Sequence, residues 1–230
     1  MYKMKLSIII PAYNEEKTIK EIIKRVKDQG ISNIQKEIIV VDDGSTDKTY
    51  EILKNIEGIN LLRHIENKGK GHAIRTGLTK VTGDFVLIQD ADLELSPEDY
   101  PDLLRPMLNG KAEVVYGSRI LGKTNSEHSL LFYAGGRTVT LAANLIYGIK
   151  ITDEPIGYKM FKTDLLKSLN LKCKRFEFCP EVTAKIANRK IKIHEVPVKY
   201  NPRTKSEGKK LGVKDGIQAI WTLIKYRFRE

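Results

Sequence analysis

Apolar residues in the first half of the chain follow two patterns that alternate. Short, nearly continuous apolar runs are typical of strands buried on both faces of a sheet. Between them, apolar residues recur three and four positions apart, as at Ile19, Ile22, Ile23 and Val26, which predicts a helix with one face on a core. The runs predict strands over residues 6–10, 37–45, 59–64, 84–89 and 113–119, and the spaced patterns predict further helices over residues 46–56, 69–81 and 97–108. This alternation predicts an α/β fold with a mostly parallel central sheet flanked by helices.

The second half of the chain has a less regular pattern. Residues 128–148 predict helical segments with a kink or break, and Gly135, Gly136 and Arg137 interrupt their apolar run. Residues 156–162 and 190–200 predict strands, with a helix over residues 179–189 between them. Residues 213–230 predict an amphipathic helix with Ile217, Ile220, Trp221, Ile224 and Phe228 on one side, and we expect Trp221 to pack in the core. Because no linker or repeat interrupts the pattern, we expect residues 1–230 to form a single domain.

Composition narrows the class of protein. The chain has 230 residues, 41% hydrophobic and 30% charged, which predicts a globular fold with a sizeable core. Its 40 basic and 29 acidic residues give a net charge of +11, which attracts nucleic acid, phosphorylated substrates or an anionic membrane surface. Cys173 and Cys179 match no disulfide framework or zinc motif, so we expect free thiols in a reducing cytoplasm. We expect no signal peptide, because no small-residue cleavage site follows the first apolar run, and no transmembrane helix, because no apolar run reaches about 18 residues.

Three carboxylates alternate directly after the predicted strand at residues 84–89, namely Asp90, Asp92 and Glu94. In open parallel sheets, ligands bind at the edge formed by the carboxyl ends of the strands. Close carboxylates repel one another unless a cation joins them, and Mg²⁺ or Mn²⁺ commonly links protein carboxylates to substrate phosphates. The pattern therefore predicts a metal site. The alternative is a solvated acidic turn before the helix at Pro97, since an isolated D-x-D pattern is common.

Two further carboxylates, Asp42 and Asp43, follow the apolar run at residues 38–41. A carboxylate at such a strand end can accept hydrogen bonds from ribose hydroxyls or base N–H groups. The next predicted helix is preceded by glycines beside Lys68 and Lys70, without the full pattern of a phosphate loop or a dinucleotide fingerprint. This segment predicts either contact with a nucleotide or pyrophosphate, or only a flexible basic turn.

Five motifs together resemble one family. The segments SIIIPAYNEEKTI, EIIVVDDGSTDKT, NKGKGHAIRTG, DADLE and GSR occur in the order and spacing of inverting family 2 glycosyltransferases, which have the A-type nucleotide-sugar fold. Within that family the chain looks similar to dolichyl- and polyprenyl-phosphate hexosyltransferases, on the segments IGYKMFK and EVPVKYNPRTKSEGKKLGVKDG. The resemblance implies a nucleotide-sugar-binding half over residues 1–119, an acceptor half over residues 120–212 and an amphipathic helix over residues 213–230.

The resemblance also implies a role for each matching residue. The residues expected to bind the nucleotide sugar are Pro11, Tyr13, Asn14, Glu15, Asp42, Asp43, Lys70, Gly71, Asp90 and Ala91. Within this set, Glu15 faces the ribose or base, and Asp42 or Asp43 holds the base. Asp90 and Asp92 bind the metal, with Glu94 near it. Asp92 carries the catalytic charge together with three basic residues that face the phosphates, namely Arg119, Arg203 and Lys205.

The activity that the resemblance implies is transfer of a hexose from GDP-mannose or UDP-glucose to a polyprenyl or dolichyl phosphate, with Mg²⁺ or Mn²⁺ as cofactor. Such an acceptor is already ionised near neutral pH and needs no general base. A saccharide or protein hydroxyl acceptor, which is the alternative, needs a base. Glu177 and Glu181 are the candidates, although Glu181 is more simply explained as a solvated residue on a helix surface.

Charge and the last helix suggest where such an enzyme acts. We expect peripheral contact with the cytoplasmic face of a membrane through residues 130–149 and the terminal helix, although core packing also explains their apolar residues. Two other classes of protein remain as alternatives. A nucleic-acid-binding module fits the charge but lacks a nucleic-acid motif, and we expect no nucleic-acid partner. A nucleotidyltransferase requires a glycine-rich loop with Arg and Lys after the first strand, which PAYNEEKT does not supply.

Overall fold

The computed structural model describes residues 4–122, 130–203 and 212–228, and within them a central sheet of seven strands. In sheet order the strands are β3 (Asn60–Arg63), β2 (Gln35–Asp42), β1 (Lys5–Ala12), β4 (Phe85–Ile88), β6 (Lys159–Lys162), β5 (Val114–Ser118) and β7 (Ile193–Pro197). β6 pairs antiparallel with both β4 and β5, and the other pairings are parallel. The predicted mostly parallel α/β sheet is therefore confirmed.

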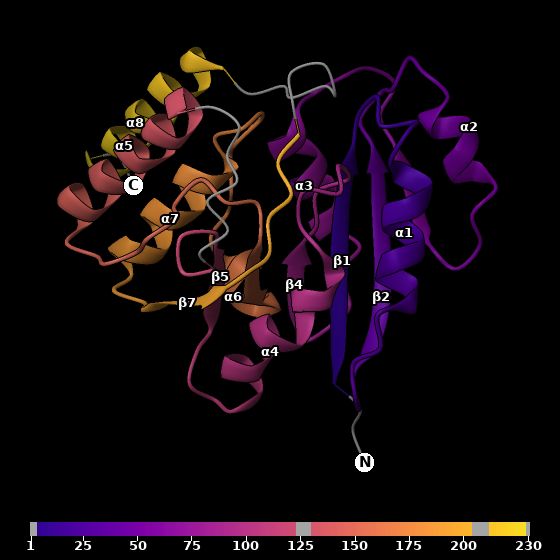
Figure 1. The fold of residues 1–230 in the computed structure, drawn as a ribbon, viewed down its shortest axis with the longest axis horizontal. Coiled ribbons are helices and arrows are strands. Elements are labelled where there is room, and N and C mark those ends of the chain that lie inside the picture. Colours follow the sequence, from indigo (N-terminus) through magenta and orange to yellow (C-terminus); the bar gives the residue numbers. More distant parts are fainter. Residues whose placement is uncertain (1–3, 123–129, 204–211, 229–230) are drawn as a thin grey trace.

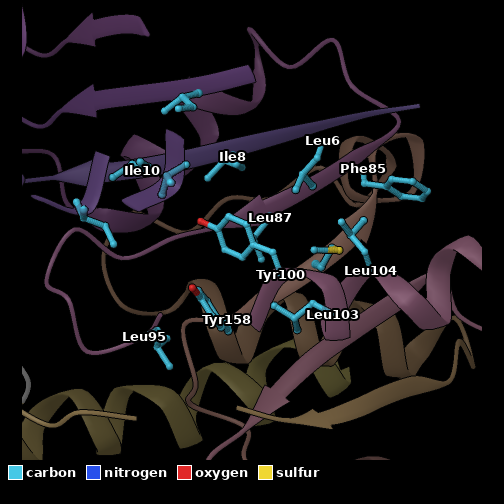
Figure 2. Close-up of a cluster of buried hydrophobic side chains, with 14 of the residues drawn as sticks. Leu6, Ile8, Ile10, Phe85, Leu87, Leu95, Tyr100, Leu103, Leu104 and Tyr158 are labelled. Atoms are coloured by element: carbon cyan, nitrogen blue, oxygen red, sulfur yellow. The ribbon is translucent and has the colours of Figure 1, made fainter. Parts of the chain in front are cut away.

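Helices cover both faces of the sheet. One face packs against α1 (Ile19–Asp28), α2 (Thr49–Lys54) and, after the short 3₁₀ turn η1 (Pro97–Asp99), α4 (Tyr100–Leu108). The other face packs against α3 (Lys70–Leu78), α6 (Thr163–Ser168) and α7 (Phe178–Asn188). The buried side chains of α1 are Ile19, Ile22, Ile23 and Val26, as the spacing predicts. Figure 2 shows part of the first core, where Leu6, Ile8 and Leu87 of the sheet meet Leu103 and Leu104 of α4.

Two long helices form a separate layer beyond the end of the sheet. α5 (Leu130–Tyr147) and α8 (Val213–Phe228) pack on α7 through a small cluster that contains Val139, Leu223 and Tyr226 (Figure 1). α5 continues through Gly135 and Gly136, so the predicted break is wrong. Gly135 and Gly136 lower intrinsic helix propensity, but packing against α7 and α8 can offset that cost.

The carboxyl ends of β1, β2 and β4 meet at one edge of the sheet. Ala12 at the end of β1 lies opposite Asp42 at the end of β2, and Ile9 of β1 lies opposite Ile88 at the end of β4. Because these strands are parallel, the segments that follow them leave the sheet on the same side. The predicted site residues after each strand are thereby brought together.

Candidate active site

The segment from Asp90 to Leu95, here called the carboxylate turn, follows β4 directly. Asp90 forms an ion pair with Lys70 at the start of α3, with 2.5 Å between the ammonium nitrogen and Oδ1. Burial opposes the charge of Lys70, yet the Asp90 carboxylate raises the pKa of Lys70 to about 12. On its other side Asp90 lies against Gly157, where a Cβ atom would overlap Oδ2 of Asp90. Asp90 therefore lies between a fixed cation and a backbone position that only glycine fits.

Asp92 and Glu15 are joined by one guanidinium group. Arg203 donates from Nη2 to Oδ2 of Asp92 at 2.9 Å and from Nη1 to Oε2 of Glu15 at 3.1 Å. Burial, followed by the nearby charges of Asp90 and Glu94, raises the pKa of Asp92 to about 7. A second positive charge beside Asp92 would therefore stabilise its ionised form.

Glu94 faces the segment that leads to Arg203. Its Oε1 accepts a hydrogen bond from the backbone N–H of Arg203 at 2.9 Å, and its Oε2 accepts one from the hydroxyl of Tyr200 at 3.3 Å. The backbone is also paired here, because Asn201 donates its N–H to the carbonyl oxygen of Glu94 at 2.9 Å and Leu95 forms a bridge with Tyr200. These contacts tie the segment before Arg203 to the carboxylate turn.

Asp90 and Asp92 offer carboxylate oxygens to a divalent cation whose remaining ligands would come from a substrate. In the described part of the chain, no three carboxylate, histidine or cysteine side chains converge as a metal cage. Glu94 is turned toward Tyr200 and Arg203, so the predicted three-carboxylate cluster is not assembled in this structure. Mg²⁺ is usually held by one or two carboxylates together with substrate phosphates, and Asp90 and Asp92 are such a pair of oxygen donors. Metal binding by Asp90 and Asp92 stays a prediction.

The segment after β1 is bonded to the segment after β2. Asn14, in the left-handed region at φ 52°, donates its backbone N–H to Ser45 Oγ at 3.0 Å and accepts at Oδ1 from the N–H of Thr46 at 2.9 Å. Pro11, Tyr13 and Asn14 are partly exposed, whereas Glu15 is buried. Partial exposure leaves the first three at the rim of the site, and their contact with a nucleotide stays a prediction.

Asp42 and Asp43 differ in their surroundings. Asp42 is buried, with Oδ1 3.3 Å from the N–H of Ser45 and Oδ2 3.4 Å from Nε of Arg63. Asp43 accepts four hydrogen bonds, from His64, Asn67 and the backbone N–H groups of Lys68 and Gly69, at 2.6–3.0 Å. Both Asp43 oxygens therefore hold the loop between β3 and α3, and contact of Asp42 or Asp43 with a base stays a prediction.

Replacement of Asp43 by Ala is expected to destabilise the protein by about 3 kcal/mol, because several partly buried donors lose their acceptor. The measurement is the free energy of unfolding in urea. Asp28→Ala, at the exposed end of α1, is the matched control and is expected to change stability by less than about 0.5 kcal/mol. An Asp43→Ala variant of normal stability that has lost nucleotide affinity would contradict the loop-holding role.

Gly71 and Ala91 are buried, whereas Lys70 is only partly buried. The N–H of Gly71 donates to the carbonyl oxygen of Arg175 at 2.9 Å, and a Cβ at Gly71 would crowd that oxygen and Sγ of Cys173. Packing of α3 against residues 173–175 thus accounts for the glycine at position 71. Nucleotide contact by Gly71 and Ala91 stays a prediction.

Arg119 is held by a carboxylate that the sequence patterns did not identify. Asp153 accepts from Nε of Arg119 at 2.8 Å, from Nη2 at 2.7 Å and from its backbone N–H at 2.9 Å. The guanidinium also lies over the ring of Tyr200, 4.9 Å from its centre. This pairing fixes the direction of the Arg119 side chain near the segment that carries Arg203. Lys205 lies outside the described residues.

Glu181 and Glu177, the two candidate bases, both accept hydrogen bonds from the backbone. Glu181 is completely buried, so the expectation of a solvated helix surface is wrong. Its oxygens accept from the N–H groups of Lys172 and Cys173 at 2.7 and 2.6 Å, and from Lys185 at 2.9 Å. Although burial opposes ionisation, the Lys185 hydrogen bond lowers the pKa of Glu181. Glu177 accepts from the N–H of Arg175 at 2.7 Å in the turn before α7.

Fold and site together define a family. The model of the family described as Glycosyl transferase family 2 matches residues 7–169, and the chain belongs to this family. It is a glycosyltransferase, and the resemblance stated from the motifs is confirmed.

Relatives of the chain include enzymes that are named as dolichyl-phosphate glycosyltransferases. The chain is 32% identical to a UDP-N-acetylglucosamine–dolichyl-phosphate N-acetylglucosaminyltransferase of Methanococcus voltae, with 94% of each chain covered. It is 31% identical to a dolichyl-phosphate beta-glucosyltransferase of Trichomonas vaginalis, covering 96% of this chain and 72% of that relative. Among solved structures it resembles glucosyl-3-phosphoglycerate synthase of Mycobacterium tuberculosis, in complex with Mn²⁺, UDP-glucose and phosphoglyceric acid, with a TM-score of 0.74, 23% identity and coverage of 97% and 80%. The last likeness confirms the A-type nucleotide-sugar fold.

Among the described residues, no helix combines the length and the apolar character needed to cross a membrane.

Proposed function

We propose that the protein is a metal-dependent inverting glycosyltransferase that moves a hexose from a nucleotide sugar to a dolichyl or polyprenyl phosphate. The observation that carries this proposal is the meeting of Asp90 and Asp92 with Lys70 and Arg203 at the carboxyl edge of the sheet. The diphosphate of the donor needs both a divalent cation and basic side chains. Asp90 and Asp92 provide ligands for the cation, and Lys70 and Arg203 are basic side chains beside them. The names of the dolichyl-phosphate relatives support the acceptor class.

The residues of the site act on the donor by charge and position. Asp90 and Asp92 would hold Mg²⁺ or Mn²⁺, which, when bound, would spread the negative charge that develops on the departing nucleoside diphosphate. Lys70 and Arg203 already lie beside these carboxylates and add positive charge at the same place. Arg119, oriented by Asp153, supplies a further cation for a phosphate. Such prearranged charge can carry a large part of the rate acceleration.

The surroundings of Glu177 and Glu181 favour a phosphate acceptor over a hydroxyl. A hydroxyl acceptor needs a general base within hydrogen-bond reach. Glu181 has both oxygens bonded to backbone N–H groups, and Glu177 caps a turn. A phosphate oxygen attacks the anomeric carbon as an anion, from the face opposite the leaving group, so no proton has to be removed.

The test is nucleoside-diphosphate release with Mn²⁺ or Mg²⁺ across GDP-mannose, UDP-glucose and UDP-N-acetylglucosamine, with and without a short polyprenyl phosphate. Release that depends on the lipid phosphate is the expected result, and the active donor identifies the sugar. Slow release that the lipid does not change would overturn the acceptor class and favour hydroxyl acceptors.

We further propose peripheral contact with the cytoplasmic face of a membrane through one surface. The α5–α8 apolar face consists of exposed side chains on two adjacent helices, Leu141, Leu145, Ile217, Trp221, Ile224 and Phe228. Trp221 is 59% exposed, so core packing of this residue is wrong, and the buried side chains among the described residues of α8 are Thr222, Leu223 and Tyr226. Exposed Lys214, Lys225 and Arg227 on α8 complement anionic lipid headgroups.

A variant that combines Trp221→Ser with Phe228→Ser is expected to bind vesicles containing anionic lipid at least about tenfold more weakly, because each buried aromatic side chain contributes about 1.5–3 kcal/mol. Cosedimentation with vesicles measures the change. Ile65→Ser, at a fully exposed apolar residue after β3, is the control and should bind as the unmodified protein does. Equal binding by all three proteins would contradict membrane contact through this face.

A further inference from the structure

Gln89 is a fully buried amide between the end of β4 and Asp90. Its side-chain oxygen accepts hydrogen bonds from the hydroxyls of Tyr100 at 2.7 Å and Tyr158 at 2.6 Å. Its side-chain nitrogen donates to the backbone carbonyl oxygens of Asp90 at 2.9 Å and Leu95 at 3.4 Å. The hydrogen-bonding capacity of the amide is therefore fully used.

The chemistry of the partners fixes which way the amide points. The carbonyl oxygens of Asp90 and Leu95 can only accept, so they must face the nitrogen, whereas the tyrosine hydroxyls can donate to the oxygen. Tyr100 comes from α4, and Tyr158 immediately precedes β6. Figure 2 shows the two hydroxyls on the same side of the buried cluster. A rotated amide would leave buried polar groups without partners, which is costly.

The two bonds from the nitrogen close the carboxylate turn at its base. Asp90 and Leu95 are the first and last residues of that turn, and Gln89 bonds the backbone of both. Within the turn, Leu93 has a φ of 63°, in the left-handed region that leucine rarely adopts. Asp90, Asp92 and Glu94 occupy alternate positions of this short turn, and close carboxylates repel one another. The turn thus combines an unfavourable backbone conformation with mutual repulsion, and it needs an external restraint.

We propose that Gln89 is a positioning residue for the metal site, whose amide holds the carboxylate turn in the shape in which Asp90 and Asp92 bind the divalent cation. This inference rests on the proposed function, because it assumes a metal at these two carboxylates. Groups that hydrogen-bond to metal ligands from behind typically account for about 10- to 100-fold in metal affinity. Gln89 bonds the backbone of one ligand and the far end of the turn that carries both.

The test is Mn²⁺ binding to the full chain, followed by the electron paramagnetic resonance signal of free Mn²⁺, with UDP and with GDP in parallel titrations. Gln89→Met keeps the length of the side chain and removes both donors. Its dissociation constant for Mn²⁺ is expected to rise about 10- to 100-fold. Tyr100→Phe is the matched control, because it removes one hydrogen bond of the same buried network and leaves both bonds to the carboxylate turn. It is expected to bind Mn²⁺ as the unmodified protein does.

Gln89→Met leaves the hydroxyls of Tyr100 and Tyr158 without their acceptor, so folding is checked by thermal unfolding. If Gln89→Met does not fold, the comparison moves to a background with both Tyr100→Phe and Tyr158→Phe, with and without Gln89→Met, where no hydroxyl is stranded. A folded Gln89→Met variant that binds Mn²⁺ as tightly as the matching protein that retains Gln89 overturns the proposal. Failure of the unmodified protein to bind Mn²⁺ with either nucleotide overturns the metal site itself, and the proposed function with it.

Discussion

Asp92→Asn is expected to lower the rate of lipid-dependent nucleoside-diphosphate release by at least about a thousandfold, because a loss of about 4 kcal/mol of charge stabilisation is three powers of ten. Asn keeps the size of the side chain and one acceptor oxygen, but it removes the anion that faces Arg203 and the proposed metal. Because burial and two neighbouring carboxylates raise the pKa of Asp92 to about 7, we expect no loss of thermal stability. Initial rates and a thermal unfolding curve measure the two effects.

The control for this variant is Asp102→Asn on α4. Asp102 is half-exposed and pairs with Arg105 one helical turn away, so its loss should leave both the rate and the melting temperature near their original values. An Asp92→Asn protein that retains a substantial fraction of its turnover would show that Asp92 does not carry the metal role.

Gly157→Ala is expected to reduce turnover about a hundredfold, the effect that a displacement of about 1 Å has on a reacting group. The added Cβ would overlap Oδ2 of Asp90, which is held from the other side by Lys70. Asp90 must then move, and with it the start of the carboxylate turn. Kinetic assays at several Mn²⁺ concentrations check this result, because a displaced metal ligand raises the metal concentration needed for half-maximal rate.

A second glycine provides the comparison for Gly157→Ala. A Cβ added at Gly30 would meet open space, so Gly30→Ala should leave turnover and metal dependence unchanged. If Gly157→Ala were as active as Gly30→Ala, the carboxylate turn would tolerate displacement of Asp90, contrary to the role proposed for that residue.

The gathering of site residues at one edge could be predicted because it depends on strand direction alone. Nearly continuous apolar runs separated by amphipathic helices require parallel strands, and parallel strands bring their carboxyl ends together. Glu15, Asp42 and Asp90 each follow such a run, and the structure places the ends of β1, β2 and β4 side by side. The roles of individual residues within that edge did not follow from the same argument.

Pairings between distant side chains could not be predicted from local pattern. Arg203 and Glu15 are 188 positions apart, and Arg119 and Asp153 are 34 apart, with no periodicity that links either pair. Gln89 looked like the last residue of a strand, and only the fold brings Tyr100 and Tyr158 to its amide. These contacts depend on where the fold places α4, β6 and the segment after β7 relative to the end of β4.

Which side of the last helix is buried could not be predicted from the sequence, for a different reason. A stripe of apolar residues shows that a helix is amphipathic, and it does not show which neighbour covers the stripe. In α8, Leu223 and Tyr226 meet α5 and α7, whereas Trp221 and Phe228 remain exposed. The same ambiguity led to the wrong expectation for Glu181, since a charged residue in the first turn of a helix is ordinarily exposed.

The position of β6 limits how the chain can be divided. β6 is encoded by residues 159–162, yet it lies between β4 and β5 and forms hydrogen bonds with both. A fragment that ended after β5 would contain all the acidic motifs, but β4 would become an open edge and β5 would lose both of its partners. Open edges of this kind promote aggregation, because unpaired backbone groups can pair with another chain. Truncation for expression or domain exchange at residue 119 would therefore cut through a cooperative unit.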